Sequence, residues 1–364
     1  MSNSLLQRLS LGSIQQHAQA ADRHGSDLSQ EVRALHAAGW LAACLPQASG
    51  GAGWGCEPDG TMPAFDALRI VGRANLSLAR LFEGHMNAVK LINLYGSDTL
   101  KAEAFEAVET GTLLGVWGAD VPDDPVIRSE GSGRITLAGT KQFASGLGLV
   151  GRAVVTVSGR QGTELWLVPA GDPDRADPAI WRMGGMRATR SGCYDYSGVE
   201  LDCACRLGGA GDYYTEPHFE GGIWRYCAAH IGAAESLYET MRDALIDRDR
   251  AGDPHQQRRL VDCAVALETM RLWTVRAACE VEAEGAPAEK AAFSLLAREV
   301  TEENCLLVMD RVERALGTAA YAEDSVIERT CRDLRLFLRQ AAPDTKRAMA
   351  AQRLIESRAT VERL

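Results

Sequence analysis

The chain has 364 residues, more than one hydrophobic core usually holds, so its length predicts two or three domains. Hydrophobic residues make up 46% and charged residues 24%, which excludes a wholly disordered or fibrous protein. A formal net charge of -10 argues against a nucleic-acid-coating surface. No apolar run approaches the roughly 20 residues of a membrane span, and the polar N-terminus is unlike a secretory signal. We therefore expect a cytoplasmic protein without a nucleic-acid partner.

The ten cysteines are scattered along the chain and do not suggest a disulfide framework. The only close pair is Cys203 and Cys205, which lacks the second pair or nearby histidines of a zinc site. We expect reduced thiols and no metal site.

The first third of the sequence has helical periodicity. One helix carries apolar residues at helical spacing: Leu28, Val32 and Leu35. A longer helical pattern runs through residues 62–97, and Ser97 is suited to cap the helix that follows. These patterns predict an N-terminal all-α domain over residues 1–112.

From Leu113 the apolar period changes to the alternation typical of strands. Short alternating segments lie between Gly, Ser, Pro and Asp punctuation at 134–145, 152–159 and 163–171. They predict a middle β domain over residues 113–207, built as a barrel or a sandwich. Beyond it, four amphipathic patterns predict a C-terminal four-helix bundle within residues 208–364. The expected helices cover about 230–252, 259–284, 287–316 and 325–339.

Five stretches occur in an order that a known family shares. They are LHAAGWLAACLPQASGGAGW (35–54), GTKQFASGLG (139–148), GMRATRSGCYDYSGVEL (185–201), DRDRAGDP (247–254) and LGTAAYAEDSVIERTCRDLR (316–335). On these motifs the chain resembles the acyl-CoA dehydrogenase superfamily of flavoproteins. The resemblance implies an α+β multidomain fold with an N-terminal all-α domain, a middle β-barrel domain and a C-terminal four-helix bundle.

The resemblance also implies that FAD is the cofactor. Phe143 and Ser145 match the family's strand that lies against the flavin, where they would supply a flat wall and a polar group, and we add Trp117 to this set. Arg248 matches an arginine that reaches the FAD of a neighbouring subunit, and Gly317 with Thr318 matches a turn near the nucleotide. Each of these assignments has a structural alternative. Phe143 and Ser145 also fit an ordinary strand end, Arg248 fits a solvated arginine, and Gly317 with Thr318 fits a helix C-cap.

Three departures from the family pattern concern chemistry. Ala119 and Asp120 stand where the family has a hydroxyl and an acid, and Ala251 stands in place of a phenylalanine. In the family's dehydrogenases a glutamate, nine residues after the arginine of the R-D pair, removes the α-proton of a thioester. Counting from Arg332 reaches Ala341, and alanine cannot accept a proton. Glu216, Glu220 and Asp344 are the replacement carboxylates that we consider, so the catalytic residue stays unknown.

Three functions follow from the resemblance. The first is an FAD-dependent oxidoreductase that transfers hydride from an acyl-CoA or acyl-carrier thioester to flavin N5, with an electron-accepting flavoprotein as a further partner. The second is a flavin-dependent monooxygenase component of the same superfamily; such members usually carry a histidine near the base position, whereas His85 is more typical of a structural residue. The third is a catalytically inactive FAD-binding member. Family members are homodimers or homotetramers, which we also expect here.

Overall fold

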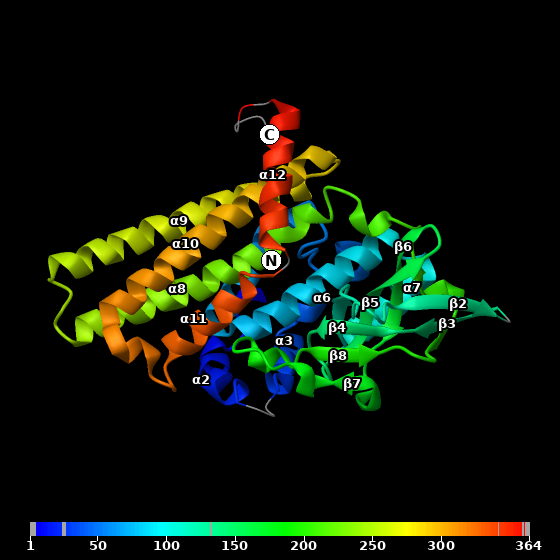
Figure 1. Cartoon of the computed structure of the whole chain (residues 1–364), viewed down its shortest axis with the longest axis horizontal. Helices are drawn as coiled ribbons and strands as arrows, with labels where there is room; N and C mark the ends of the chain where they lie inside the picture. The colour runs from blue at the N-terminus through cyan, green and yellow to red at the C-terminus, as the bar shows by residue number, and fades with distance from the viewer. Residues whose placement is uncertain (1–4, 24–26, 132, 341, 359, 361–364) are drawn as a thin grey trace.

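The computed structural model describes residues 5–23, 27–131, 133–340, 342–358 and 360. Helices, strands and then helices again follow one another along the chain, and the strands lie to one side of the long helices (Figure 1). This order confirms the expected fold class. The ten cysteines are all free thiols. Among the described residues, no helix has the length and hydropathy of a bilayer span and no cluster of side chains could hold a metal ion.

The N-terminal region is helical up to Glu109. Its helices are α2 (Leu11–Ala21), α3 (Ser29–Ala37), α4 (Trp40–Ala43), α5 (Thr61–Ala74), α6 (Leu76–Tyr95) and α7 (Asp98–Glu109). The helical pattern over 62–97 forms two helices, because the chain leaves helical geometry at Asn75. The Asn75 side chain accepts a hydrogen bond from the backbone N–H of Leu78 at 3.1 Å and so begins α6 as an N-cap. Ser97 caps α7 in the same way, as expected, through the N–H of Leu100.

The middle region holds two sheets. Its strands are β1 (Leu113–Trp117), β2 (Ile127–Gly131), β3 (Arg134–Ala138), β4 (Thr140–Ala144), β5 (Val150–Gly159), β6 (Gly162–Pro169), β7 (Ala176–Asp177), β8 (Gly192–Asp195), β9 (Glu200–Leu201) and β10 (Arg206–Leu207). The larger sheet has the order β10-β6-β5-β2-β3-β9 with β1 pairing parallel to β5, and the smaller has the order β4-β8-β7. β5 and β6 each bury five consecutive residues, as strands covered on both faces do, and β1, which pairs with β5, packs along α6.

The C-terminal region packs long helices against one another and against α5. They are α8 (Trp224–Asp247), α9 (Pro254–Glu282), α10 (Ala291–Leu316) and α11 (Val326–Phe337). A further helix, α12 (Pro343–Ser357), projects from the side of the bundle, and the sequence patterns did not predict it (Figure 1). Its one fully buried residue is Ala350, with Met349 and Leu354 partly buried, so its apolar face is narrow and hard to recognise in the sequence.

Candidate functional site

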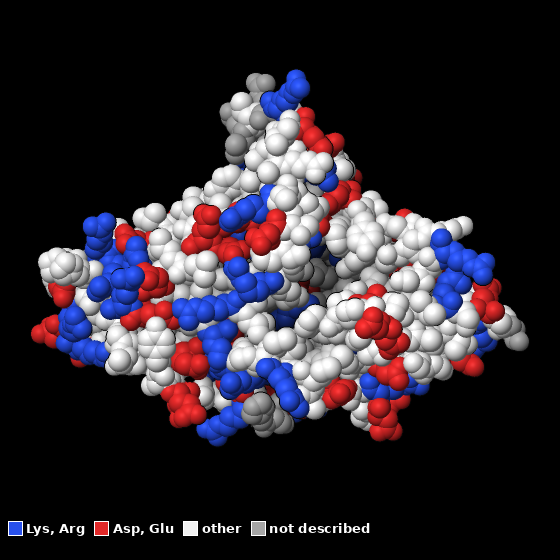
Figure 2. All heavy atoms as spheres, in the orientation of Figure 1, with Lys and Arg blue, Asp and Glu red and all other residues white. Residues whose placement is uncertain are grey.

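The surface is hollowed beside the base of α12, between the bundle and the strands (Figure 2). In the same orientation, α6 and the base of α12 lie beside this hollow (Figure 1). A small cavity lies between α6 and the edge of the sheet, where Arg80 and Gly84 face Trp117 and Ser145. This is the place where helices from both ends of the chain meet the β region, and we take it as the candidate site.

Trp117 and Ser145 are joined at the edge of the sheet. The indole Nε1 of Trp117, the last residue of β1, donates a hydrogen bond to the carbonyl oxygen of Ser145 at 3.0 Å. The Trp117 ring is buried and packs at 5.2 Å from the ring of Tyr194. The hydroxyl of Ser145 lies 2.9 Å from that of Ser191. The two residues therefore form one rigid wall, because each is fixed by a neighbour on an adjacent strand.

Phe143 lies next to this wall in an unusual conformation. The pairing of β4 with β8 shifts register between Lys141 and Ala144, and Phe143 takes a φ of 54° in the left-handed region that non-glycine residues rarely occupy. Its side chain is 50% exposed, with one edge-on contact to Trp181 at 6.2 Å. An aromatic ring held at the surface in a strained conformation offers a flat apolar contact to a planar ligand.

The α6 face of the site carries a buried carboxylate that the sequence analysis missed. Glu83 accepts hydrogen bonds from Arg80 and from Asn87, one turn before and one turn after it on α6. Burial raises the pKa of the Tyr213 phenol to about 12, and the nearby charge of Glu83 adds to this effect. A charged residue within the apolar run of α6 was the available signal, since such a residue is rarely buried without a function or a partner.

Aromatic side chains line the α8 side. His230 is fully buried, its ring lies edge-on to Phe337 at 4.5 Å, and Tyr226 packs 5.5 Å from His230. Burial, assisted by the charge of Arg298, lowers the pKa of His230 to about 3, so its ring is neutral. His85 is structural, as expected: one ring nitrogen lies 3.1 Å from the carbonyl oxygen of Leu41 and the other accepts from the N–H of Leu114.

The replacement carboxylates are poorly placed to act as a base. Glu220 is buried, but its carboxylate is paired with the ammonium of Lys346 from α12. Asp344 is exposed in the first turn of α12. Ala341 lies outside the described residues. Glu216 is half-buried, and one of its carboxylate oxygens accepts from the backbone N–H groups of Glu220 and Gly221. None of the three carboxylates is both buried and free, as a base that takes a carbon-bound proton has to be.

The structure separates the residues expected to bind the cofactor into two groups. Arg248 follows α8, while Gly317 and Thr318 follow α10, and all three are exposed. These helix ends lie at the end of the bundle that points away from the strands (Figure 1). Trp117, Phe143 and Ser145 come together, whereas the Arg248 group lies outside the site that a single chain forms.

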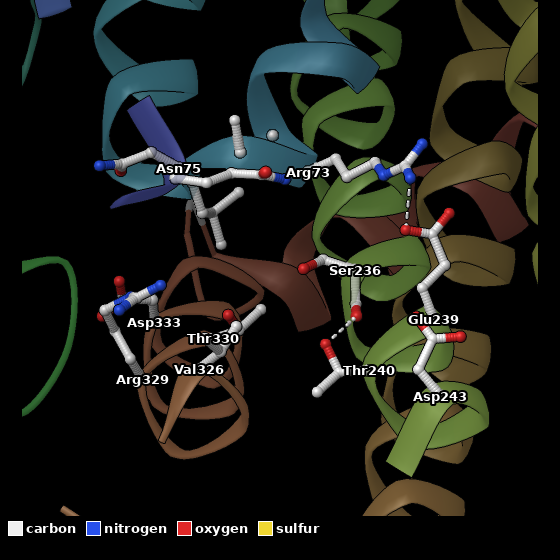
Figure 3. Close-up of a pocket in the computed structure, with 14 residues that line it drawn as sticks. Arg73, Asn75, Ser236, Glu239, Thr240, Asp243, Val326, Arg329, Thr330 and Asp333 are labelled. Carbon is white, nitrogen blue, oxygen red and sulfur yellow. Dashed lines mark hydrogen bonds and ion pairs between the residues drawn. The ribbon is translucent and has the colours of Figure 1, made fainter. Parts of the chain in front are cut away.

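A separate cavity of about 350 Å³ lies between the junction of α5 with α6, α8 and α11 (Figure 3). Its charged lining is already paired, as in the ion pair of Arg73 with Glu239, and Thr240 donates to the carbonyl of Ser236 at 2.8 Å. Asp333 and Arg329 border it from α11. Since opposite charges line it together, it has no net charge to favour an ionic ligand, and the site over α6 is the stronger candidate.

Two family models match this chain. The model described as acyl-CoA dehydrogenase, N-terminal domain, matches residues 6–112, and the one described as acyl-CoA dehydrogenase, C-terminal domain, matches residues 209–338. Together the two ranges cover more than half of the sequence.

Curated relatives are monooxygenases by name. The chain is 28% identical over 193 residues to a dibenzothiophene monooxygenase of Rhodococcus qingshengii; this match covers 50% of the chain but 45% of the relative, so it spans less than half of that protein. It is 25% identical over 297 residues to a probable FMNH2-dependent monooxygenase, SfnC, of Pseudomonas putida, covering 75% of the chain and 72% of the relative.

Solved structures share the fold over nearly the whole chain. FMN-bound TdsC of Paenibacillus sp. A11-2 has a TM-score of 0.84 at 20% identity and covers 99% of this chain and 98% of its own. The methanesulfinate monooxygenase MsuC of Pseudomonas fluorescens has a TM-score of 0.83 at 19% identity, with coverage of 98% and 97%. At these identities the likeness concerns the fold.

Proposed function

Because this chain belongs to the acyl-CoA dehydrogenase superfamily, we propose that it is a flavin-dependent monooxygenase rather than a dehydrogenase of thioesters. The observation that carries this proposal is the state of the carboxylates around the site. Glu220 is paired with Lys346, Glu83 is held by Arg80 and Asn87, and Asp344 is exposed. A base for thioester dehydrogenation needs a free carboxylate in an apolar site, and none of these three provides one. We therefore favour monooxygenation over the expected dehydrogenation of an acyl-CoA thioester.

The residues of the wall fit a flavin. The exposed ring of Phe143 suits stacking or edge contact with a planar heterocycle, and the buried Trp117 fixes the backbone of Ser145 beside it. When bound in reduced form, a flavin supplies the electrons that activate O₂. The protein itself would hold the ring, exclude water with aromatic side chains and present polar groups at the edge of the ring. The neutral ring of His230 and the protonated phenol of Tyr213 suit this role, because neither brings a charge into the site.

We propose FMN rather than FAD as the working cofactor. The FMNH2-dependent relative supports this choice. The partner is then a reductase that supplies reduced FMN, in place of the expected electron-accepting flavoprotein. A homodimer or homotetramer, in which Arg248 reaches a neighbouring subunit, stays part of the proposal.

The substrate class that fits the site is a small, flat, apolar molecule. Tyr213, Tyr214 and Phe219 form an edge-to-face cluster with ring centroids 4.9 to 5.2 Å apart, and Tyr226 packs on the buried ring of Phe337 at 6.3 Å. Aromatic walls of this kind favour aromatic and organosulfur compounds over a long, charged thioester. The dibenzothiophene monooxygenases among the relatives support this class.

The decisive experiment supplies FMN, NADH, a flavin reductase and O₂ to the purified chain with a panel of thiophenes, indoles and small sulfur compounds. We expect an oxygenated product, detected by mass spectrometry with ¹⁸O₂ as the label, and catalase in the assay removes peroxide chemistry. Anaerobic bleaching of the bound flavin by acyl-CoA thioesters would instead support the dehydrogenase. Failure of the protein to bind either FMN or FAD would refute both.

A further inference from the structure

The cavity of Figure 3 lies apart from the flavin wall, and three segments of the chain line it. Its polar lining includes Asn75 from the junction of α5 with α6, Ser236 and Thr240 from α8, and Thr330 and Asp333 from α11. Its volume of about 350 Å³ is many times the roughly 10–15 Å³ that one water molecule requires, and it is typical of a pocket for a small ligand. The cavity is therefore large enough for a small organic molecule.

The uncharged side chains of this lining have hydrogen-bonding capacity that the protein itself does not use. Asn75 accepts from the N–H of Leu78 through its amide oxygen, which leaves both protons of its amide nitrogen to donate. Thr240 donates to the carbonyl of Ser236, which leaves its lone pairs to accept. Within the described part of the chain, the hydroxyls of Ser236 and Thr330 have no hydrogen-bond partner. The cavity thus offers donors and acceptors from three segments.

The charged side chains around the cavity are already paired. Arg73 forms an ion pair with Glu239, and Arg329 donates to the side-chain oxygen of Gln19 at 2.6 Å. Because opposite charges cancel along the lining, the cavity does not favour an ion. Of the described residues that line it, none is aromatic, so it offers no flat surface to a planar ring. What remains favoured is a neutral molecule with polar groups on several sides.

We propose that this cavity is a second ligand site, which binds a neutral polyhydroxyl molecule of about the size of a monosaccharide. Each hydroxyl of such a molecule can donate one hydrogen bond and accept two, so it matches the mixed lining of Asn75, Ser236 and Thr330. An apolar molecule of the same size would leave these groups unpaired at a cost in free energy. The site is separate from the flavin wall, and the inference does not depend on the proposed monooxygenase function.

Hydrogen bonds to neighbouring segments hold the lining in place, which lowers the cost of binding. Asn75 is fixed as the N-cap of α6. Asp333 accepts at 2.6 Å from the N–H of Met186, which precedes the short turn Arg187–Thr189 behind the flavin wall. The carbonyl of Thr189 in turn accepts from the N–H of Gly146 at 2.8 Å. The cavity is thus preformed, and through Asp333 it contacts the turn that supports the wall.

The test measures direct binding of named probes to the purified chain without flavin, by saturation-transfer difference NMR and isothermal titration calorimetry. D-glucose and myo-inositol are the polyhydroxyl probes, sulfate is the anionic probe and indole is the flat apolar probe. We expect saturable binding of at least one polyhydroxyl probe, with a dissociation constant on the order of 1 mM, and no displacement by sulfate or indole. Binding is measured directly because polyhydroxyl compounds also raise the thermal stability of proteins without occupying a site.

Two variants place the bound probe in the cavity. Ser236→Leu removes a hydroxyl and fills part of the space, so the affinity should fall at least about tenfold. Asn75→Asp keeps the acceptor that caps α6 but removes the amide protons, so the affinity should fall about three- to tenfold. Ser97→Asp introduces the same residue at the exposed N-cap of α7, outside the cavity, and should bind the probe as the wild type does. Circular dichroism checks that each variant is folded.

Every other result counts against the proposal. Absence of saturable binding of both polyhydroxyl probes would show that water alone fills the cavity. Equal affinity of the wild type, Ser236→Leu and Asn75→Asp would place the probe elsewhere on the chain, and displacement by sulfate would identify the ligand as an anion. Each of these three outcomes overturns the proposal. A failure of the chain to bind FMN or FAD would leave it intact, because the titration contains no flavin.

Discussion

Glu282, the last residue of α9, is the negative charge in a buried cluster with two cations, Arg225 and Lys90. Its carboxylate accepts from Arg225 at 2.6 Å, from Lys90 at 2.8 Å and from the indole of Trp224 at 3.1 Å. Burial alone would raise the pKa of Glu282, but the two cations outweigh it and hold the pKa below its usual value. Arg225 also donates to the carbonyl of Gly55 at 2.7 Å, so it is a structural cation.

Replacing Glu282 should therefore be among the most destabilising single changes in this protein. Glu282→Gln keeps the shape but leaves Arg225 and Lys90 buried without a counter-charge, and we expect a loss of about 3–5 kcal/mol in the free energy of unfolding. Urea denaturation followed by circular dichroism measures it. Glu284→Gln, two residues on and exposed, is the control and should stay within about 0.5 kcal/mol of the wild type. Equal stability of the two variants would show that the cluster contributes nothing.

At the scale of the elements, the sequence predicted the helices and strands whose ends are marked by Gly, Pro or capping residues. It missed the features that depend on distant partners. Gly252 and Pro254 mark the break between α8 and α9 in the sequence, and Ser97 marks the capped start of α7. The carboxylate of Glu83 and the aromatic walls were missed because residues far apart in the chain assemble them. Ser145 could be predicted as a residue of the wall, but the hydroxyl that it contacts, that of Ser191, lies 46 residues later in the chain.

α12 is the element whose docking depends most on charge. Lys346 pairs with the buried Glu220 and lies 5.4 Å from the ring of Phe219, while Arg347 bonds Glu299 of α10 at 2.5 Å. Ala350 is the one apolar side chain that it fully buries. The hollow beside it is consequently bordered by a helix that ion pairs hold in place.

Removing the charge of Lys346 should loosen α12 before the rest of the fold. Lys346→Met keeps the length of the side chain but leaves Glu220 buried without a partner, at a cost of about 1–3 kcal/mol. We expect faster hydrogen exchange of α12 amides, read by mass spectrometry, with unchanged protection in α8 and α10. The double variant Glu220→Gln with Lys346→Met removes both charges and should recover part of the protection. Gln352→Ala, on the exposed face of α12, serves as the control, and α12 protection equal to wild type in Lys346→Met would rule out this docking role.

At the scale of the whole molecule, one charged cluster joins all three regions. Arg332 of α11 donates to Asp22, just after α2, at 2.5 Å and to the carbonyl of Gly184 in the β region at 2.6 Å. Next to it, Asp333 accepts from the N–H of Met186. The R-D pair that served as a sequence motif is thus the point where the bundle holds the N-terminal helices and the turn behind the flavin wall. Its motif could be found in the sequence, but its partners come from segments about 150 and 310 residues away.

Because this junction contains a buried acid, the stability of the whole chain should depend on pH through Asp333. Burial raises the pKa of Asp333 to about 7, in spite of the charges of Arg332 and Arg329, while an unfolded aspartate titrates near ~3.9. Between these values the folded state binds the extra proton, so stability falls as the pH rises from about 4 to 7, by at most about 1.4 kcal/mol per pH unit. Asp333→Asn stays neutral and keeps an acceptor for Met186, which removes this component. Urea denaturation from pH 5 to pH 8 should therefore show a flatter decline for Asp333→Asn than for the wild type, and the difference should be largest at pH 8. Asp344→Asn, at an exposed carboxylate, should keep the wild-type slope. A wild-type slope in Asp333→Asn would mean that the buried acid is ionised throughout, and that the three regions are joined by a permanent ion pair rather than by a protonated carboxyl.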